Sequence, residues 1–272
     1  MLLSFLDSFI QWANSCLMES DDAKDYLRGR GVSEEQWVRH RLGFTYGDFS
    51  VNQYLDSRHN KECGNKQNKR LWCDSCRYIN WSTSWIQNEN YPDDESKYPI
   101  TGRRISNSIV FPLTNYSGHT VGFVVRSIYE KSYNTFVLRH RPEGYFFGVS
   151  QSVQSIWTSK EAWIVEGPFD FLVLERLVTK NILCLATSST SKEQAKFLRR
   201  FTVTVNSCLD LDAAGRKGLR SLIKWNSSYF EIRDIKYPKI KSSDKDLGDF
   251  WNSVGDDRFK HYFEDAMVSQ IG

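Results

Sequence analysis

The sequence lacks several features that would place it in other classes of protein. No stretch approaches the roughly 20 consecutive apolar residues that a helix needs to cross a bilayer. There is no P-loop of the GxxxxGKS/T type, which argues against a fused ATPase or helicase. Internal repeats and low-complexity runs are absent as well. What remains is a chain of 272 residues, 40% hydrophobic and 25% charged, enough for two modest globular domains.

The chain also lacks an excess of one charge. The net charge of +3 is too small to indicate nucleic-acid binding by itself. Any such argument depends on where the arginines and lysines cluster, and two pairs stand out, Arg103 with Arg104 and Arg139 with Arg141. A solvated charged surface is the alternative for each cluster.

The apolar start of the chain has no basic leader, and Asp7 interrupts it. Leu3, Leu6, Phe9, Ile10 and Ala13 recur at helical spacing, which predicts an amphipathic helix instead of a signal peptide. We therefore expect a cytoplasmic protein.

Residues 1–45 are expected to be helical. Ser33 and Gln36 fit a capping box, and Gly29 and Gly31 interrupt the preceding helix. Residues 46–100 are irregular, and the polar segment 87–98 predicts an exposed loop.

The pattern becomes β from residue 108 onward. Strands are expected at residues 109–113, 120–126 and 135–138. Beyond about residue 155 strands and helices alternate, with strands at 162–165, 182–186, 203–209 and 229–235, and helices at 169–177, from 191 (capped by Ser191 and Gln194), and at 213–225. Such alternation predicts a parallel sheet that is covered on both faces.

Acidic side chains follow three of the expected strands. Glu166 comes directly after the first, Asp210 and Asp212 follow the third, and residues 244–249 follow the last. Side chains just beyond the strand ends of an α/β sheet lie where such folds place their chemistry. Carboxylate oxygens there suit one or two Mg²⁺ or Mn²⁺ ions, which position and neutralise phosphates. Each group also has a structural alternative, as a turn or as the acidic first turn of a helix.

Four segments resemble a Toprim domain: EGPFD at 166–170, TSST at 187–190, LDLDAAGRKG at 209–218 and DKDLGDF at 244–250. Residues 22–44 and 105–128 resemble the preceding part of bacterial-type (DnaG-like) primases. The resemblance implies an α+β primase-like subdomain over 1–155, with a cysteine-containing insertion near 46–100, an α/β Toprim domain over 156–255, and a C-terminal tail over 256–272.

The resemblance also implies roles for residues. Glu166, Asp210 and Asp212 correspond to catalytic acids that bind Mg²⁺ or Mn²⁺, with Glu166 alternatively a general acid or base. Asp246 corresponds to a further acidic position, with Asp244 and Asp249 as alternatives. Arg103, Arg104 and Arg126 correspond to basic residues that, in the family, face the nucleotide and the template. The family also has a lysine that this chain lacks, and Arg139 or Arg141 would supply its charge. Ala186 stands where the family pattern has glycine.

The six cysteines divide into a cluster and a scattered set. His59, Cys63, Cys73 and Cys76 have the spacing H-x3-C-x9-C-x2-C, which suits a structural zinc site, or else a loop of reduced thiols. Cys16, Cys184 and Cys208 lie in apolar surroundings and are expected to be buried thiols.

The function that the resemblance implies is RNA primer synthesis on single-stranded DNA, a nucleotidyl transfer. The expected partners are single-stranded DNA, NTPs and a replicative helicase. The alternative is a Toprim nuclease that cuts DNA or RNA. The sequence starts too late for the family's zinc ribbon and ends too early for its helicase-docking region, which suggests a phage or mobile-element protein.

Overall fold

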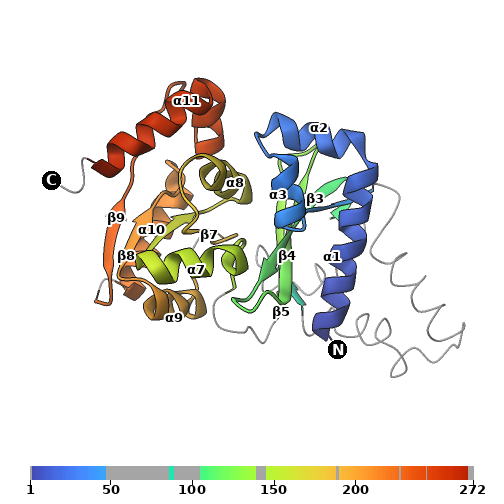
Figure 1. The fold of residues 1–272 in the computed structure, drawn as a ribbon, viewed down its shortest axis with the longest axis horizontal. Helices are drawn as coiled ribbons and strands as arrows, with labels where there is room; N and C mark the ends of the chain where they lie inside the picture. The colour runs from blue at the N-terminus through green and yellow to red at the C-terminus, as the bar shows by residue number, and fades with distance from the viewer. Residues whose placement is uncertain are drawn as a thin grey trace, which may run out of the picture. The chain divides into compact units, whose positions relative to one another are not determined.

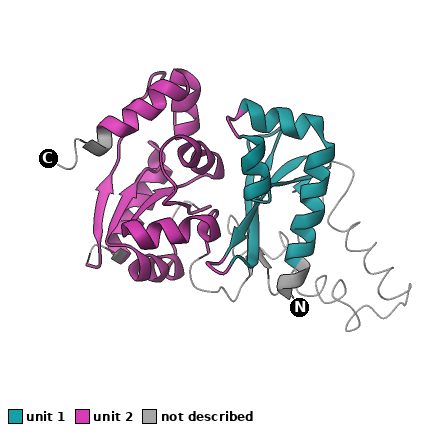
Figure 2. Ribbon diagram, in the orientation of Figure 1, with its two compact units in different colours: residues 1–29, 33–114, 118–142 teal, residues 30–32, 115–117, 143–272 magenta. Residues whose placement is uncertain are grey.

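The structure, a computed structural model, describes residues 2–46, 86–88, 105–138, 145–187, 190–226, 228–242 and 244–268. The chain divides into two compact units (Figure 2). Unit 1 comprises residues 1–29, 33–114 and 118–142, and unit 2 comprises residues 30–32, 115–117 and 143–272. Each unit has its own sheet (Figure 1). This agrees with the expected fold class, an α+β part followed by an α/β part.

Unit 1 contains an antiparallel sheet of strand order β1-β3-β4-β5-β2. Its strands are β1 (Gly43–Thr45), β2 (Ile86–Asn88), β3 (Ser108–Thr114), β4 (Thr120–Ser127) and β5 (Tyr133–Leu138). The three strands expected between residues 109 and 138 are confirmed. The loop expected from residue 87 is wrong for Gln87 and Asn88, which belong to β2 and pair with β5. A three-residue strand is too short to show an alternating pattern.

Three helices precede this sheet in the chain: α1 (Leu2–Glu19), α2 (Asp21–Gly29) and α3 (Glu34–Arg39). The predicted amphipathic helix is confirmed, because Leu6, Phe9, Ile10 and Ala13 of α1 are all buried. The ring of Phe9 packs on that of Phe123 in β4, with centroids 5.0 Å apart. The predicted capping box of Ser33 and Gln36 opens α3.

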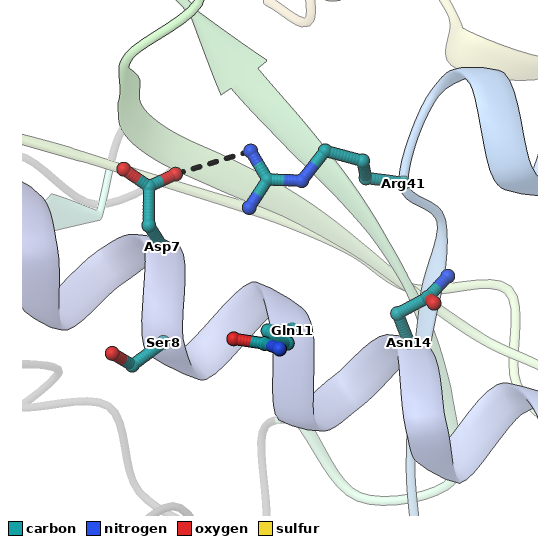
Figure 3. Close-up of a pocket in the computed structure, with 5 residues that line it drawn as sticks. All are labelled: Asp7, Ser8, Gln11, Asn14 and Arg41. Atoms are coloured by element: carbon teal, nitrogen blue, oxygen red, sulfur yellow. Dashed lines mark hydrogen bonds and ion pairs between the residues drawn. The ribbon is translucent and has the colours of Figure 1, made fainter.

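Asp7, which interrupts the apolar start of the chain, has a structural role in unit 1. Its carboxylate pairs with Arg41 at 3.1 Å (Figure 3), and it also accepts a hydrogen bond from the hydroxyl of Thr120. Asp7, Arg41, Ser8, Gln11 and Asn14 line a pocket of about 340 Å³. The ion pair thus joins α1 to the segment that follows α3.

Unit 2 contains a parallel sheet of strand order β7-β6-β8-β9. The strands are β6 (Glu161–Val165), β7 (Ile182–Cys184), β8 (Thr204–Ser207) and β9 (Glu231–Asp234). All four expected strands are present; β6 is one residue longer than expected, and the other three are shorter by two or three residues.

Helices cover both faces of the parallel sheet (Figure 1). They are α7 (Val149–Ser159), α8 (Pro168–Leu177), α9 (Lys192–Phe201), α10 (Ala213–Asn226) and α11 (Leu247–Val268). Ala162 and Ile164 of β6 face a core built with α7, α9 and α10. Trp163, which alternates with them, meets Phe263 of α11 instead, with ring centroids 6.0 Å apart. The doubly covered sheet explains why β6 and β7 are largely apolar and buried.

The boundaries of the parts differ from those expected. The expected domain boundary at residue 155 falls inside α7, whose Val149 and Ile156 belong to the core of unit 2. Residues expected to form a tail continue α11 beyond a bend at Gly255, and their Phe259 and Phe263 are fully buried. Among the described residues, no helix is both long enough and apolar enough to span a membrane.

The side chain of Gln194 holds the start of α9 against the rest of unit 2. It completes the predicted capping box with Ser191. Its amide nitrogen also donates to the carbonyl oxygens of Tyr145 and Leu185, both at 3.2 Å, and the side chain is fully buried. One residue thus satisfies buried backbone groups of three segments.

We expect Gln194→Ala to lower the free energy of unfolding by about 2–4 kcal/mol, because the cap is lost and two buried carbonyl groups lose a donor. Urea denaturation followed by circular dichroism measures the change. Gln154→Ala, at an exposed glutamine of α7, is the control. Equal stability of the two variants would contradict this account.

Candidate functional site

The predicted acidic residues lie along the carboxyl edge of the parallel sheet. Glu166 directly follows β6, and Asp210 lies three residues beyond β8. These strands are neighbours in the centre of the sheet. The chain runs from β6 outward to β7 and then returns to β8 on the other side, so Glu166 and Asp210 flank the point where the strand order reverses. Open α/β sheets bind ligands at this point.

Specific hydrogen bonds bring the remaining acidic loop to the same edge. The amide of Leu211 donates to the carbonyl of Lys245 at 2.9 Å, which ties the loop after β8 to the start of α11. The hydroxyl of Tyr237 lies 3.4 Å from the carbonyl oxygens of Leu209 and Lys245. Asp246 is therefore held close to Asp210.

Asp170 is the residue of this site that sequence reasoning missed. It lies in the first turn of α8, and only 6% of it is exposed. Its carboxylate accepts the amide of Gly248 in α11 at 3.0 Å. Asp170 therefore joins the segment that carries Glu166 to the segment that carries Asp246. The signal was available, since Asp170 closes the EGPFD segment that pointed to the Toprim domain.

The other acidic side chains serve the backbone of their own loops. Asp212 accepts the amides of Ala214 and Gly215 at 2.8 and 3.0 Å, and so caps α10. Asp246 accepts the amide of Asp249 at 2.8 Å at the start of α11, while Asp249 accepts that of Lys245 at 2.9 Å. Such caps satisfy helix amides that have no partner within the helix.

Asp244, which the sequence offered as an alternative to Asp246, closes the preceding turn. It accepts the amides of Ile240 and Lys241 at 3.1 and 2.8 Å and is buried. These contacts all fall on its Oδ2, and the charge of Asp246, not that of Asp244, is among those that raise the pKa of Asp210.

Burial and mutual repulsion disfavour the charged forms of the central carboxylates. Burial, followed by the charges of Asp170 and Glu166, raises the pKa of Asp210 to about 9. Burial and the charge of Asp212 raise the pKa of Glu166 to about 7. The pKa of Asp170 is also raised, by burial first and then by Asp246. Neither Glu166 nor Asp210 has a cationic partner among the described residues.

The donor set suits a hard divalent cation, but it does not form a closed cage. In the described part of the chain, no three histidine, cysteine or acidic side chains converge to enclose a metal ion. Mg²⁺ commonly keeps several waters and takes one or two carboxylates directly, together with phosphates of the substrate. An open row of carboxylates that repel one another fits such an ion, whose charge would relieve the repulsion.

The backbone around this edge is closely packed. A Cβ at position 215 would overlap the carbonyl oxygen of Asp210, so Gly215 allows the first turn of α10 to press against that loop. Ala186, which replaces the family's glycine, has φ +58° and donates its amide to the carbonyl of Glu166 at 3.2 Å. The left-handed conformation that glycine would adopt freely is therefore kept here by alanine, at a cost of roughly 1–2 kcal/mol.

Of the predicted basic residues, the structure describes Arg126. It lies in β4 of unit 1, is 7% exposed, and its guanidinium stacks on the ring of Tyr133, 4.5 Å from the centroid. No described residue hydrogen-bonds its Nε. Arg103, Arg104, Arg139 and Arg141 lie outside the described residues, as do the candidate zinc ligands His59, Cys63, Cys73 and Cys76. The three scattered cysteines, Cys16, Cys184 and Cys208, are confirmed as buried free thiols.

Comparison with known proteins agrees with this arrangement. Residues 163–250 match the Toprim-like family. DNA primase from Aquifex aeolicus is 22% identical over 255 residues, which are 90% of this chain and 46% of the relative. DNA primase from Listeria monocytogenes is 27% identical over 265 residues, 93% of this chain and 38% of the relative. The chain thus spans less than half the length of these curated relatives.

Solved structures share the fold along almost the whole chain. The zinc-binding and RNA polymerase domains of the Aquifex aeolicus primase match with a TM-score of 0.70 and 22% identity, covering 96% of this chain and 59% of that one. A DnaG primase catalytic domain bound to single-stranded DNA matches with a TM-score of 0.69 and 20% identity, covering 97% and 80%. The fold of this chain is therefore that of a primase catalytic core.

The raised pKa values predict how the stability of the metal-free protein depends on pH. The pKa values of Asp210 and Glu166 in the folded state, about 9 and about 7, exceed the usual values of about 4 in an unfolded chain. At a pH between a group's unfolded and folded pKa values, the folded state therefore binds more protons than the unfolded state. Stability should therefore fall as pH rises from about 5 to about 8, by at least about 2 kcal/mol.

Thermal unfolding in EDTA across this pH range measures the effect. In Asp210→Asn the decline should be smaller, because the most strongly shifted group is gone, and Mg²⁺ at pH 8 should raise the melting temperature of the wild type. A wild-type stability that rises with pH between 5 and 8 would contradict the assignment of these pKa shifts.

Proposed function

We propose that this chain, whose fold is that of the DnaG-like primase catalytic core with a Toprim module, is a DNA primase that synthesises short RNA strands on single-stranded DNA. The observation that carries the proposal is the cluster of Glu166, Asp170, Asp210 and Asp246 at the carboxyl edge of the parallel sheet, where burial and repulsion raise the pKa of three of them. A module that only binds template has no use for carboxylates that repel phosphate.

In this proposal Glu166, Asp210, Asp212 and Asp246 hold Mg²⁺ or Mn²⁺. When bound, the ions align and neutralise the phosphates for in-line attack. The chain's own residues build the edge on which this happens. Asp170 ties α8 to α11, and the hydrogen bond from Leu211 to Lys245 fixes the distance between the two loops that carry Asp210 and Asp246.

Primer synthesis joins two nucleotides. The 3′ hydroxyl oxygen forms a bond to the α-phosphorus of the incoming NTP, the bond to the β-phosphate breaks, and diphosphate leaves. The hydroxyl proton needs an acceptor. Glu166 has two alternative roles here: it holds a metal ion with the other acids, or it stays free of metal and accepts this proton as a general base.

Arg126 supports a role in binding anions. A guanidinium has five N–H donors and a permanent charge, and the buried Nε of Arg126 has no hydrogen-bond partner among the described residues. We propose that Arg126, with Arg103, Arg104, Arg139 and Arg141, contacts the phosphates of nucleotide and template. The partners in this proposal are single-stranded DNA, NTPs and a replicative helicase.

We expect Asp210→Asn to reduce primer synthesis about 100-fold or more, because it removes one charged ligand from the edge without changing its size. The assay contains mixed-sequence single-stranded DNA, four NTPs and Mg²⁺ or Mn²⁺, with RNA products resolved on a gel. Asp257→Asn, at an exposed position of α11, is the control and should retain activity.

The same experiment separates the functions. RNA from the wild type and the control but not from Asp210→Asn supports a primase. Metal-dependent shortening of the DNA, without RNA, would assign the chain to the nuclease alternative. Absence of both activities, also with a replicative helicase added, would overturn the proposal of an enzyme.

The cysteine cluster has a separate test. We propose that His59, Cys63, Cys73 and Cys76 bind one structural Zn²⁺, and we expect the purified protein to contain zinc that Cys73→Ser loses. Mass spectrometry of the metal content measures it, with Cys16→Ala as the control at a buried thiol outside the cluster. Unchanged zinc content in Cys73→Ser would contradict the proposed zinc site.

A further inference from the structure

Unit 2 has a second feature at the carboxyl edge of its sheet, a pocket of about 270 Å³ beside Asp210. It lies among the loop after β8, the first turns of α10 and the segment that follows β9. Its lining combines one predicted catalytic acid with three cationic side chains; the residues are Leu209, Asp210, Leu211, Gly215, Arg216, Leu219, Asp234, Lys236 and Lys239.

The three cations are only partly used by the protein itself. Arg216 donates one hydrogen bond to the carbonyl of Leu211 at 3.3 Å. Lys236 pairs with Asp234 at 2.5 Å, but its side chain is 65% exposed, and an exposed ion pair of this kind contributes little to stability. Lys239 has no hydrogen bond or ion pair with any described residue.

The segment that carries the two lysines is firmly anchored. Ile235 and Tyr237 are buried, and the ring of Tyr237 stacks on that of Phe250. Lys236 and Lys239 are exposed, and Pro238 between Tyr237 and Lys239 restricts the backbone. Flexible cationic side chains are therefore presented from a fixed backbone at the rim of the pocket.

The backbone amides at the start of α10 do not form an anion site in this pocket. The carboxylate of Asp212 already accepts the amides of Ala214 and Gly215, so these amides are not available to an anion. Binding of an anion here would come from the side chains of Arg216, Lys236 and Lys239. Guanidinium and ammonium groups are the usual partners of phosphate oxygens.

We propose that this pocket binds phosphate groups of the substrate beside the carboxylates, and that Arg216 and Lys239 are its main ligands. The inference rests on the proposed function and deepens it. The acidic edge repels phosphate wherever it is not neutralised, so cations next to Asp210 are needed to hold a polyanion there. The pocket is smaller than the roughly 300–1,000 Å³ of sites that enclose a whole ligand, which suits phosphate groups alone.

Two sources offer this chemistry, the triphosphate of an NTP and the phosphodiester backbone of a strand. The test compares wild type, the double variant Arg216→Ala/Lys239→Ala, and the control Lys217→Ala, an exposed lysine of α10 that does not line the pocket. Calorimetry in Mg²⁺ measures the Kd of ATP and, separately, the Kd of a single-stranded thymidine oligonucleotide. Thermal unfolding verifies that each variant is folded.

We expect the double variant to weaken ATP binding about tenfold or more, with the control unchanged. Weakened ATP binding assigns the pocket to the triphosphate, and weakened oligonucleotide binding alone assigns it to the strand; both results support a phosphate site. Wild-type affinity of the folded double variant for both ligands would overturn it.

The outcome is separate from that of the proposed function. If the wild type makes no RNA but its ATP binding depends on Arg216 and Lys239, the pocket stands and the primase assignment fails. If the wild type makes RNA and the double variant binds both ligands normally, the pocket proposal alone fails.

Discussion

Repulsion between buried carboxylates is the constraint on which the functional half of this protein depends. Burial raises the pKa of Asp170, Asp210 and Glu166, the charges of Asp170 and Glu166 also raise that of Asp210, and the charge of Glu166 also raises that of Asp170. Such an arrangement lowers stability at neutral pH unless protons or a cation offset the charge. The fold tolerates it because the acids lie where loops meet at a sheet edge, while the apolar faces of the sheet remain sealed by helices.

The same constraint explains the division of labour among the acids. Four of the carboxylates accept hydrogen bonds from backbone amides and so stabilise the loops; they are those of Asp212, Asp244, Asp246 and Asp249. Glu166 and Asp210 make no side-chain hydrogen bond with a described residue, so their oxygens remain available. Arg216, Lys236 and Lys239 line the pocket that Asp210 also lines, while Asp170 is not part of that lining.

Features with a local cause could be predicted from the sequence. Both capping boxes, the amphipathic α1, the strands around residues 109–126 and the alternating α/β pattern follow from short-range patterns, and the structure has them. Features that depend on distant partners could not. The pairing of β2, the bond from Asp170 to Gly248 and the burial of Phe259 and Phe263 each need a segment far away in the chain. In the sequence, Asp170 is indistinguishable from an ordinary acidic residue in the first turn of a helix. Its role becomes visible only when the structure brings α11 next to it.

The strand order of unit 2 has a consequence for the order of events during synthesis of the chain. The acids at the carboxyl edge come from segments between residues 166 and 249, and the sheet that aligns them pairs β6 with β8 across an intervening strand and two helices. Such long-range parallel pairing forms slowly and late. The set of acids at this edge is therefore incomplete on a nascent chain until the start of α11 has left the ribosome.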